Sequence, residues 1–469
     1  MNKKEEILGL VITDGVGYRN FCLSSFLEKA ADGFKEIIIY SGLPKEVYDL
    51  SDYNNVEVVE LPVFVETFKT WFWRKFKEVA HLQNHKENFG INDNLNANRS
   101  LANSNRGHAT RLIYKITSIF HSEKNNHFFE KRQKQTLHAH NVTKFCENKL
   151  KEQKPDLLFF THQRPPYVVP LVVAAEKLNI KTGSFIFSWD NLASKGRMAA
   201  TFNFYFVWSD LMKEELLHFY PNTDINKVKV VGTPQFEPYV LKEYQRDTVE
   251  FFLKFNLDQN IKTLCFSCGD VSTSKNDPLY IETIAEAILN NSFGTMVNFL
   301  VRTSPAEEPD RFKYLQKKYP FIVWNFPKWE MARKDHPEPW SQRIPTSDDL
   351  ADLRMILENS DVGINMCSTM SLDFMQFDKP VINPVFGNIE NGLYNDQRFL
   401  KYAHYKRVVE SNAVVIAKNK EELKSSINHQ LKNPEERKLE RQKLLNLQIG
   451  KPLLDTGKRI TEQLLDEIE

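Results

Sequence analysis

Short, almost wholly apolar segments alternate with amphipathic segments along the first 240 residues. The apolar runs predict strands at 7–15, 36–42, 56–62, 155–162, 183–190, 202–210 and 228–234. Helical periodicity predicts helices at 21–31, 170–180 and 211–220. Because strands that are apolar on both faces belong to a sheet that is covered on both sides, this half of the chain predicts an open parallel α/β sheet.

A second series of the same kind follows a charged connection at 232–261. Its predicted strands lie at 263–270, 298–305, 321–326, 361–366 and 379–386, and its helices at 278–291, at 350–359 and from Ser371 onward. A chain of 469 residues is longer than one hydrophobic core usually supports. We therefore expect two Rossmann-like doubly wound parallel-sheet domains that face a cleft. The expected bounds are 1–240 and 241–450, with a closing C-terminal helix at 451–469.

An insertion at about 64–140 interrupts the first series and is predicted to be helical. Residues 64–144 hold 14 Lys and Arg against 6 Asp and Glu, and the motif WFWRKF places cations among aromatic side chains. One interpretation is a solvated helical excursion. The other is a basic, aromatic surface that contacts an anionic membrane or holds a lipid-linked or polyanionic acceptor.

The overall charge and the cysteine content narrow the class of protein. A formal net charge of +1 lacks the field of a nucleic-acid binder, so we expect no nucleic-acid partner. Five cysteines, an odd number, do not form a disulfide framework and favour a reducing cytoplasm.

The stretch MCSTMSLDFMQFDKPVINPVFG carries the strongest candidate chemistry. A buried strand ends at Cys367, and Ser368 and Thr369 open a helix, where free backbone N–H groups favour an anion such as a diphosphate. The alternative is that these two residues only cap the helix.

Other polar groups at strand ends and helix starts of the second domain are candidates for binding the same anion. Arg302 is the better phosphate candidate among them because a guanidinium binds phosphate oxygens in pairs, although a surface ion pair is the alternative. Asp348 and Asp349 lie in the first turn of a helix, where acids are favourable in any case. The further candidates are Gly269, Asp270, Lys275 and Ser304.

Three strand ends of the first domain carry unusual polar groups, and the carboxyl ends of parallel strands open onto the ligand crevice. A carboxylate or an imidazole at this edge can act as a general base that takes the proton of a bound hydroxyl, and we rank Asp190 first, Asp14 second and His162 third for this role. For each of them a capping or satisfied polar role is the alternative. The residues expected to contact the acceptor, which is the molecule that carries this hydroxyl, are Arg19, Arg164, Asn191, Ser194 and Lys195.

The segments SWDNLASKG, VWSDLMKEEL and VVGTPQFEPY, together with the motif around Ser368, resemble GT-B glycosyltransferases of the bacterial cell-surface polysaccharide kind. The resemblance covers most of the chain apart from the insertion. It implies a spacing Ser368-x-x-Ser371-x-Asp373 in which Asp373 meets the ribose of the donor, and it places Asp348 and Asp349 near the nucleotide base. The Gly-rich loop after the first strand is reduced to GVG in this chain.

The resemblance implies transfer of a sugar from a nucleotide-activated donor, linked to UDP, GDP or CDP, to a surface-polysaccharide or lipid-linked acceptor. It implies no metal and no separate cofactor, and a cytoplasmic protein, peripheral on the inner face of the membrane if the insertion binds lipid. The alternatives are a CDP-glycerol glycerophosphotransferase, whose base is a histidine, and a non-catalytic nucleotide-binding scaffold. A nucleotide-sugar 2-epimerase shares the fold but has no need of a basic acceptor insertion.

Overall fold

The computed structural model describes residues 5–387 and 396–468, and it divides into two compact units. The first unit comprises the described part of Met1–Glu237, together with Met331–Ile344 and the described part of Gln448–Glu469. The second unit comprises the described parts of Pro238–Glu330 and Pro345–Leu447. Neither unit is therefore a continuous stretch of chain.

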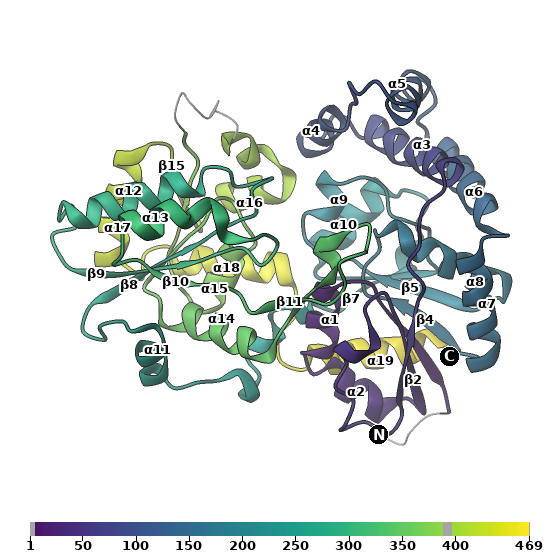
Figure 1. The fold of residues 1–469 in the computed structure, drawn as a ribbon, viewed down its shortest axis with the longest axis horizontal. Helices are drawn as coiled ribbons and strands as arrows, with labels where there is room; N and C mark the ends of the chain where they lie inside the picture. The colour runs from purple at the N-terminus through teal and green to yellow at the C-terminus, as the bar shows by residue number, and fades with distance from the viewer. Residues whose placement is uncertain (1–4, 388–395, 469) are drawn as a thin grey trace. The chain divides into compact units, whose positions relative to one another are not determined.

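The first unit contains a seven-stranded sheet in the order β3-β2-β1-β4-β5-β6-β7, and every neighbouring pair is parallel (Figure 1). Its strands are β1 (Ile7–Ile12), β2 (Glu36–Ser41), β3 (Val56–Glu60), β4 (Leu157–Phe160), β5 (Lys181–Phe185), β6 (Phe204–Val207) and β7 (Val228–Val230). The helices outside the insertion are α1 (Gly15–Cys22), α2 (Phe26–Gly33), α8 (Val169–Lys177), α9 (Asn191–Ser194), α10 (Asp210–Phe219) and α19 (Thr456–Ile468). The strand order reverses direction at β1 and β4, which are neighbours in the sheet, so their carboxyl ends lie at the usual ligand position of such sheets.

The insertion is helical, as the sequence predicts. It consists of α3 (Phe68–Asn84), α4 (Phe89–Ala97), α5 (Asn105–Thr117) and α6 (Glu123–Leu137), and α7 (Asn141–Gln153) leads back to the sheet. Much of the WFWRKF motif packs inward, because Trp71 and Phe76 are buried and the Phe76 ring lies 4.9 Å from that of Phe129 on α6. The side chain of Lys77 is also fully buried, and its ammonium donates to the carbonyl of Ala199.

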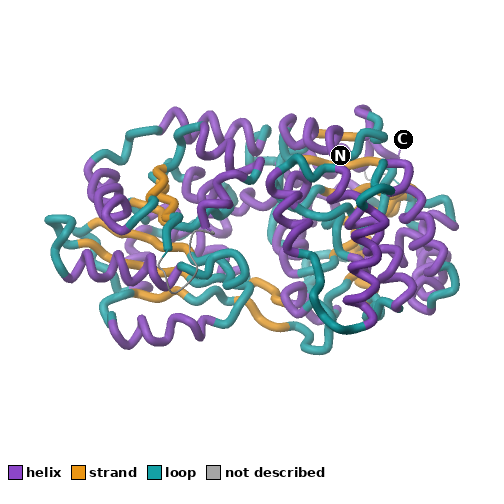
Figure 2. Tube along the Cα trace, turned by 90° about the horizontal axis from the view of Figure 1, so that it is seen from above, coloured by secondary structure: helices purple, strands orange, loops and turns teal. Residues whose placement is uncertain are grey.

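The second unit contains a six-stranded parallel sheet in the order β10-β9-β8-β13-β14-β15. Its strands are β8 (Lys262–Ser267), β9 (Val297–Arg302), β10 (Val323–Asn325), β13 (Val362–Ile364), β14 (Val381–Pro384) and β15 (Val415–Ala417). Its helices are α11 (Thr248–Phe255), α12 (Asp277–Leu289), α13 (Lys313–Lys318), α14 (Ser347–Asn359), α15 (Met370–Gln376), α16 (Ala403–Glu410), α17 (Lys420–Lys432) and α18 (Lys438–Ile449). In the tube view the strands of each unit run between layers of helix (Figure 2).

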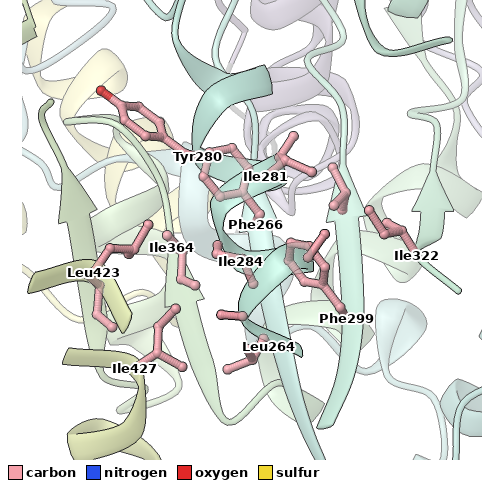
Figure 3. Packing of buried hydrophobic residues seen from close by; sticks show 14 of the residues in the cluster. Leu264, Phe266, Tyr280, Ile281, Ile284, Phe299, Ile322, Ile364, Leu423 and Ile427 are labelled. Carbon is pink, nitrogen blue, oxygen red and sulfur yellow. The ribbon is translucent and has the colours of Figure 1, made fainter. Parts of the chain in front are cut away.

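The core of the second unit lies between its sheet and the helices α12 and α17. In Figure 3 the side chains of Leu264 and Phe266 of β8, Ile284 of α12 and Ile427 of α17 belong to one cluster, and all four are fully buried. Apolar residues on successive turns of both helices point at the strands, which is the packing that an amphipathic helix needs beside a sheet. Burying a side chain of this size contributes about 1.5–3 kcal/mol.

The structure confirms the predicted fold class of two Rossmann-like parallel-sheet domains with a basic helical insertion. It also differs from the sequence prediction in several elements. The single helix expected at 21–31 is two helices, α1 and α2, which are separated at 23–25. The strand β15 and the short hairpin of β11 (Trp329–Met331) and β12 (Arg343–Pro345) were not predicted.

Candidate functional site

The ends of the neighbouring strands β1 and β4 bring Asp14 and His162 into contact in the first unit. The Nδ1 atom of His162 lies 2.8 Å from the Oδ2 atom of Asp14, and both side chains are buried. Sequence reasoning proposed both residues but did not pair them, because 148 positions separate them in the chain.

Asp14 is held rigidly in its position. It is the N-cap of α1, where it accepts from the backbone N–H of Gly17 at 2.8 Å, and it also accepts from the Thr13 hydroxyl at 2.8 Å. Burial alone would raise the pKa of Asp14, but the interaction with His162 and these hydrogen bonds outweigh it and lower the pKa. Asp14 is therefore an ionised carboxylate that orients the imidazole.

His162 presents a bare nitrogen on its other side. Its ring stacks on that of Phe187 with centroids 3.8 Å apart and planes 11° apart, and its Nε2 atom is buried without a hydrogen-bond partner among the described residues. Burial lowers the pKa of His162, and Asp14 only partly opposes this shift. With Asp14 as acceptor, the proton lies on Nδ1 and the lone pair lies on Nε2.

Asp190 is close to this pair, but its carboxylate is bound by Lys195 and Asn191. Its side chain is 24% exposed, its carboxylate lies 3.5 Å from the ammonium of Lys195, and it accepts from the Asn191 amide at 3.1 Å. The Ser194 hydroxyl donates to the backbone carbonyl of Asp190 at 2.6 Å, so it stabilises the short helix α9. The negative charge of Asp190 opposes the lowering of the pKa of His162 by burial, so the two groups act on one another.

The two arginines expected at the acceptor differ in their surroundings. Arg19 is buried and donates to the carbonyl of Gln235 at 3.0 Å and to the amide of Asn20 at 3.1 Å, which gives it a structural role. Arg164 is close enough to lower the pKa of His162 by its charge. Its Nε atom is buried and has no hydrogen-bond partner in the described part of the chain.

In the second unit the backbone turns sharply between β13 and α15. Cys367 adopts a left-handed conformation with φ of 48°, which is uncommon for a residue other than glycine and occurs in functional turns. The N–H of Ser368 donates to Asn365 at 2.9 Å, and its hydroxyl accepts from the N–H of Met370. Ser368 and Thr369 remain partly exposed at this turn.

The residues that follow this turn are buried in a polar network. The hydroxyl of Ser371 contacts Asn365 at 3.1 Å and Tyr405 at 2.9 Å, and the Asn383 amide donates to it at 3.2 Å. The carboxylate of Asp373 accepts from the hydroxyl of Tyr239. This network fixes the conformation of the turn that presents Ser368 and Thr369.

Arg302 and Asp349 form a buried ion pair. The guanidinium of Arg302 lies 2.8 Å from Asp349 and also donates to Asn325, and Asp349 accepts from the indole of Trp329 at 2.9 Å. Arg302 is 5% exposed, so it joins β9 to α14 instead of projecting from the strand end. By contrast, the side chain of Asp348 is 71% exposed, and Ser304 accepts from the N–H of Ala306 at 3.2 Å.

The loop after β8 is fixed by two residues that sequence reasoning did not single out. Asp277 accepts from the N–H of Gly269 at 2.9 Å, and Arg311 donates to the carbonyl of Gly269 at 2.7 Å. Burial raises the pKa of Asp277 to about 7 although Arg311 opposes it. Asp270 accepts from the N–H of Ser272 within the same loop, and Lys275 is exposed.

The described residues contain no group of three or more His, Cys, Asp or Glu that could hold a metal ion. Over the same residues, no helix is both long and apolar enough to span a membrane.

Comparison with known proteins identifies the fold of the chain. No protein-family model matches the sequence, and no curated protein matches it either. Among solved structures, the chain is similar to a UDP-N-acetylglucosamine 2-epimerase described as putative from Listeria monocytogenes, with a TM-score of 0.54 at 10% identity over 99% of this chain and 97% of that one. It is similar to a glycosyltransferase from Rickettsia africae, with a TM-score of 0.53 at 12% identity over 100% and 99% of the two chains. It is also similar to the UDP-GlcNAc 2-epimerase of Neisseria meningitidis bound to UDP-GlcNAc, with a TM-score of 0.51 at 12% identity over 98% and 100%.

These similarities cover nearly the whole length of each chain and show the GT-B fold. At 10–12% identity they describe the architecture and leave the reaction to the residues of the site.

Proposed function

We propose that this protein is a metal-independent GT-B glycosyltransferase that moves a sugar from a nucleotide-activated donor, linked to UDP, GDP or CDP, to a surface-polysaccharide or lipid-linked acceptor. The observation that carries the proposal is the buried Asp14–His162 pair, in which Nδ1 is bound and Nε2 is bare. This arrangement fits a general base because a third group orients the imidazole and its pKa keeps it neutral at physiological pH.

The reaction follows from these groups. Nε2 of His162 takes the proton of the acceptor hydroxyl as the oxygen bonds to the anomeric carbon of the donor, and the bond from that carbon to the phosphate oxygen breaks with release of the nucleotide diphosphate. The imidazolium that forms is stabilised by the carboxylate of Asp14. Asp190, which sequence reasoning ranked first, becomes the reserve candidate for the base.

The proposed donor site lies in the second unit. Ser368 and Thr369 stand at the turn after β13, the position at which ligands bind to open α/β sheets. The helix α15 has only seven residues, so we propose that hydroxyl and amide donors of the turn contribute more than a helix dipole. Ser371 and Asp373 support the turn through buried hydrogen bonds.

Two substitutions test the assignment of the base. His162→Gln should lower turnover about 10²- to 10⁴-fold because the general base is lost, while nucleotide affinity stays within about twofold. Asp190→Asn should retain most of the turnover. Release of nucleotide diphosphate measures turnover, and calorimetry with UDP, GDP and CDP measures affinity. The reverse pattern, with a normal rate for His162→Gln and a collapsed rate for Asp190→Asn, would return the role to Asp190.

Two related reactions remain candidates for specific reasons. A CDP-glycerol glycerophosphotransferase fits a histidine base, and a 2-epimerase fits because two of the similar structures are UDP-N-acetylglucosamine 2-epimerases. Incubation with UDP-N-acetylglucosamine alone, followed by NMR, detects epimerisation because that reaction needs no acceptor. Glycerol phosphate transfer from CDP-glycerol is measured by release of CMP.

We also propose a cytoplasmic location with peripheral binding of the insertion to the inner face of the membrane. The support is a set of exposed apolar side chains beside the lysines and arginines of this segment. The set consists of Leu101 at 96%, Leu112 at 51%, Ile119 at 74%, Phe120 at 53% and Phe128 at 52% exposure.

A further inference from the structure

Residues 331–344, which we call the inserted segment, belong to the first unit although the chain on both sides belongs to the second. Its anchors are specific. Gln342 is fully buried and donates to the carbonyl of Gly42 at 3.3 Å, and Arg333 forms an ion pair with Glu60. The ring of His336 packs edge-on against that of Tyr167, with centroids 5.1 Å apart, so the segment contacts the residues that closely follow His162.

The inserted segment brings an aromatic ring to His162. The Trp340 indole is 43% exposed, and its ring centroid lies 6.5 Å from that of the imidazole. The carboxyl group of Glu338, two positions earlier in the segment, lies beside Trp340, and burial raises its pKa. A large aromatic side chain that is left open to solvent beside a buried imidazole is typical of a ligand-binding wall.

The side chain of Arg164 supplies a positive charge near His162 and the inserted segment. Arg164 acts on both His162 and Glu338 through its charge, and its Nε is buried without a hydrogen-bond partner in the described structure. A guanidinium with unmet donors beside a catalytic base is suited to a phosphate or carboxylate oxygen. The neighbouring Arg74 differs because Glu66 and Glu78 already bind it, at 2.7 and 2.6 Å.

We propose that Trp340 and Arg164 form an acceptor subsite with His162. It takes a sugar or polyol against the indole and an anionic group, a phosphate or a carboxylate, at the guanidinium. A phosphate-linked lipid acceptor and an acidic glycan share this chemistry. That the ligand is an acceptor rests on the proposed function, but its binding at Trp340 and Arg164 can be measured without turnover.

Binding to the full-length protein tests the subsite with three probes: glucose 1-phosphate, glucose and inorganic phosphate. The wild type should bind glucose 1-phosphate more tightly than either fragment. Trp340→Ala should weaken glucose 1-phosphate about tenfold and leave phosphate unchanged, since only the ring contact is lost. Arg164→Gln should weaken both phosphate-bearing probes about tenfold and leave glucose unchanged. Trp340→Phe should restore most of the affinity that Trp340→Ala loses.

Two matched controls lie away from the site. Tyr314→Ala removes an aromatic ring that is 49% exposed on α13, and Arg246→Gln removes an arginine that donates to the backbone carbonyls of Glu243 and Gln245. Both should bind all three probes as the wild type does. Unchanged affinities in Trp340→Ala and Arg164→Gln would overturn the subsite.

Measuring UDP binding to the same variants tells whether Arg164 binds an anion of the acceptor or the phosphates of the donor. UDP should bind Arg164→Gln as it binds the wild type if the anion belongs to the acceptor. An equal loss for UDP and glucose 1-phosphate would assign Arg164 to the donor and refute the acceptor subsite. If His162→Gln keeps full turnover while the probe pattern holds, the proposed base fails and the subsite stands.

Discussion

Gly15 at the start of α1 is the position where a single methyl group should have the largest effect on the site. A Cβ atom added there would lie 1.7 Å from the carbonyl oxygen of Arg343 and 2.7 Å from its carbonyl carbon, both of which are backbone atoms of the inserted segment. Since real Cβ contacts essentially never fall below 3.0 Å, the segment or the helix start must move by about 1.3 Å. That movement strains the hydrogen bond from Gln342 to Gly42 and the N-cap at Asp14.

We expect Gly15→Ala to lower the free energy of unfolding by about 1–3 kcal/mol, the usual cost of overpacking. Urea denaturation followed by tryptophan fluorescence measures the loss, and hydrogen exchange should show reduced protection in 331–344. Gly196→Ala is the matched control, because its added Cβ would lie 3.8 Å from the nearest atom, in Glu78. In the control the free energy should stay the same or rise slightly. Equal stability of the two variants would refute the close approach of Gly15 to the inserted segment.

Three further predictions concern other parts of the chain. Replacing Ser368 and Thr369 together with Ala should weaken the binding of nucleotide diphosphates in calorimetry, and unchanged affinity for UDP, GDP and CDP would exclude this turn as the donor site. The protein should co-sediment with anionic vesicles more than with neutral ones at low salt. The double variant Ile119→Ser, Phe120→Ser should reduce this binding, whereas the control Leu253→Ser on α11 should not. Equal recovery in all conditions would leave only the interpretation of the insertion as a solvated helical segment. Burial lowers the pKa of His81 well below 6.5, so the unfolded chain binds the proton more strongly than the folded chain does. The free energy of unfolding should therefore fall as the pH drops below about 6.5, by up to about 1.4 kcal/mol per pH unit. His81→Phe should flatten this slope in urea titrations, and a slope identical to that of the wild type would show that other groups cause it.

The fold could be predicted from the sequence because its signals are local. Apolar runs such as LLFF at 157–160 and NFLV at 298–301 mark strands that are buried on both faces, and the strands are joined by amphipathic helices. The two sheets follow from the order of these elements. The strand β15 shows the limit of the approach, since it was missed although β7, β10 and β13, which are equally short, were predicted.

The candidate site could be predicted only as a set of separate strand ends. Asp14 and His162 were identified because polar residues follow apolar strands, but their pairing depends on β1 and β4 being neighbours in the sheet. Likewise, the sequence shows Arg302 at a strand end but not that Asp349 on α14 neutralises it. Trp340 could not be found, because its position beside His162 results from the tertiary anchoring of the inserted segment and not from any local pattern.

The discontinuity of the first unit has a consequence for the order in which the protein folds during synthesis. Helix α19 packs against this unit, where the N–H of Gly457 donates to Glu237 at 3.2 Å and Lys181 forms an ion pair with Glu467 at 2.8 Å. The ribosome therefore releases every strand of the second sheet, through β15 at 417, before it releases the helix that completes the first unit. Chains that end at 447, the last residue of the second unit, should hold a protease-resistant second unit beside a first unit that is still open to cleavage, the reverse of the usual N-terminal-first order.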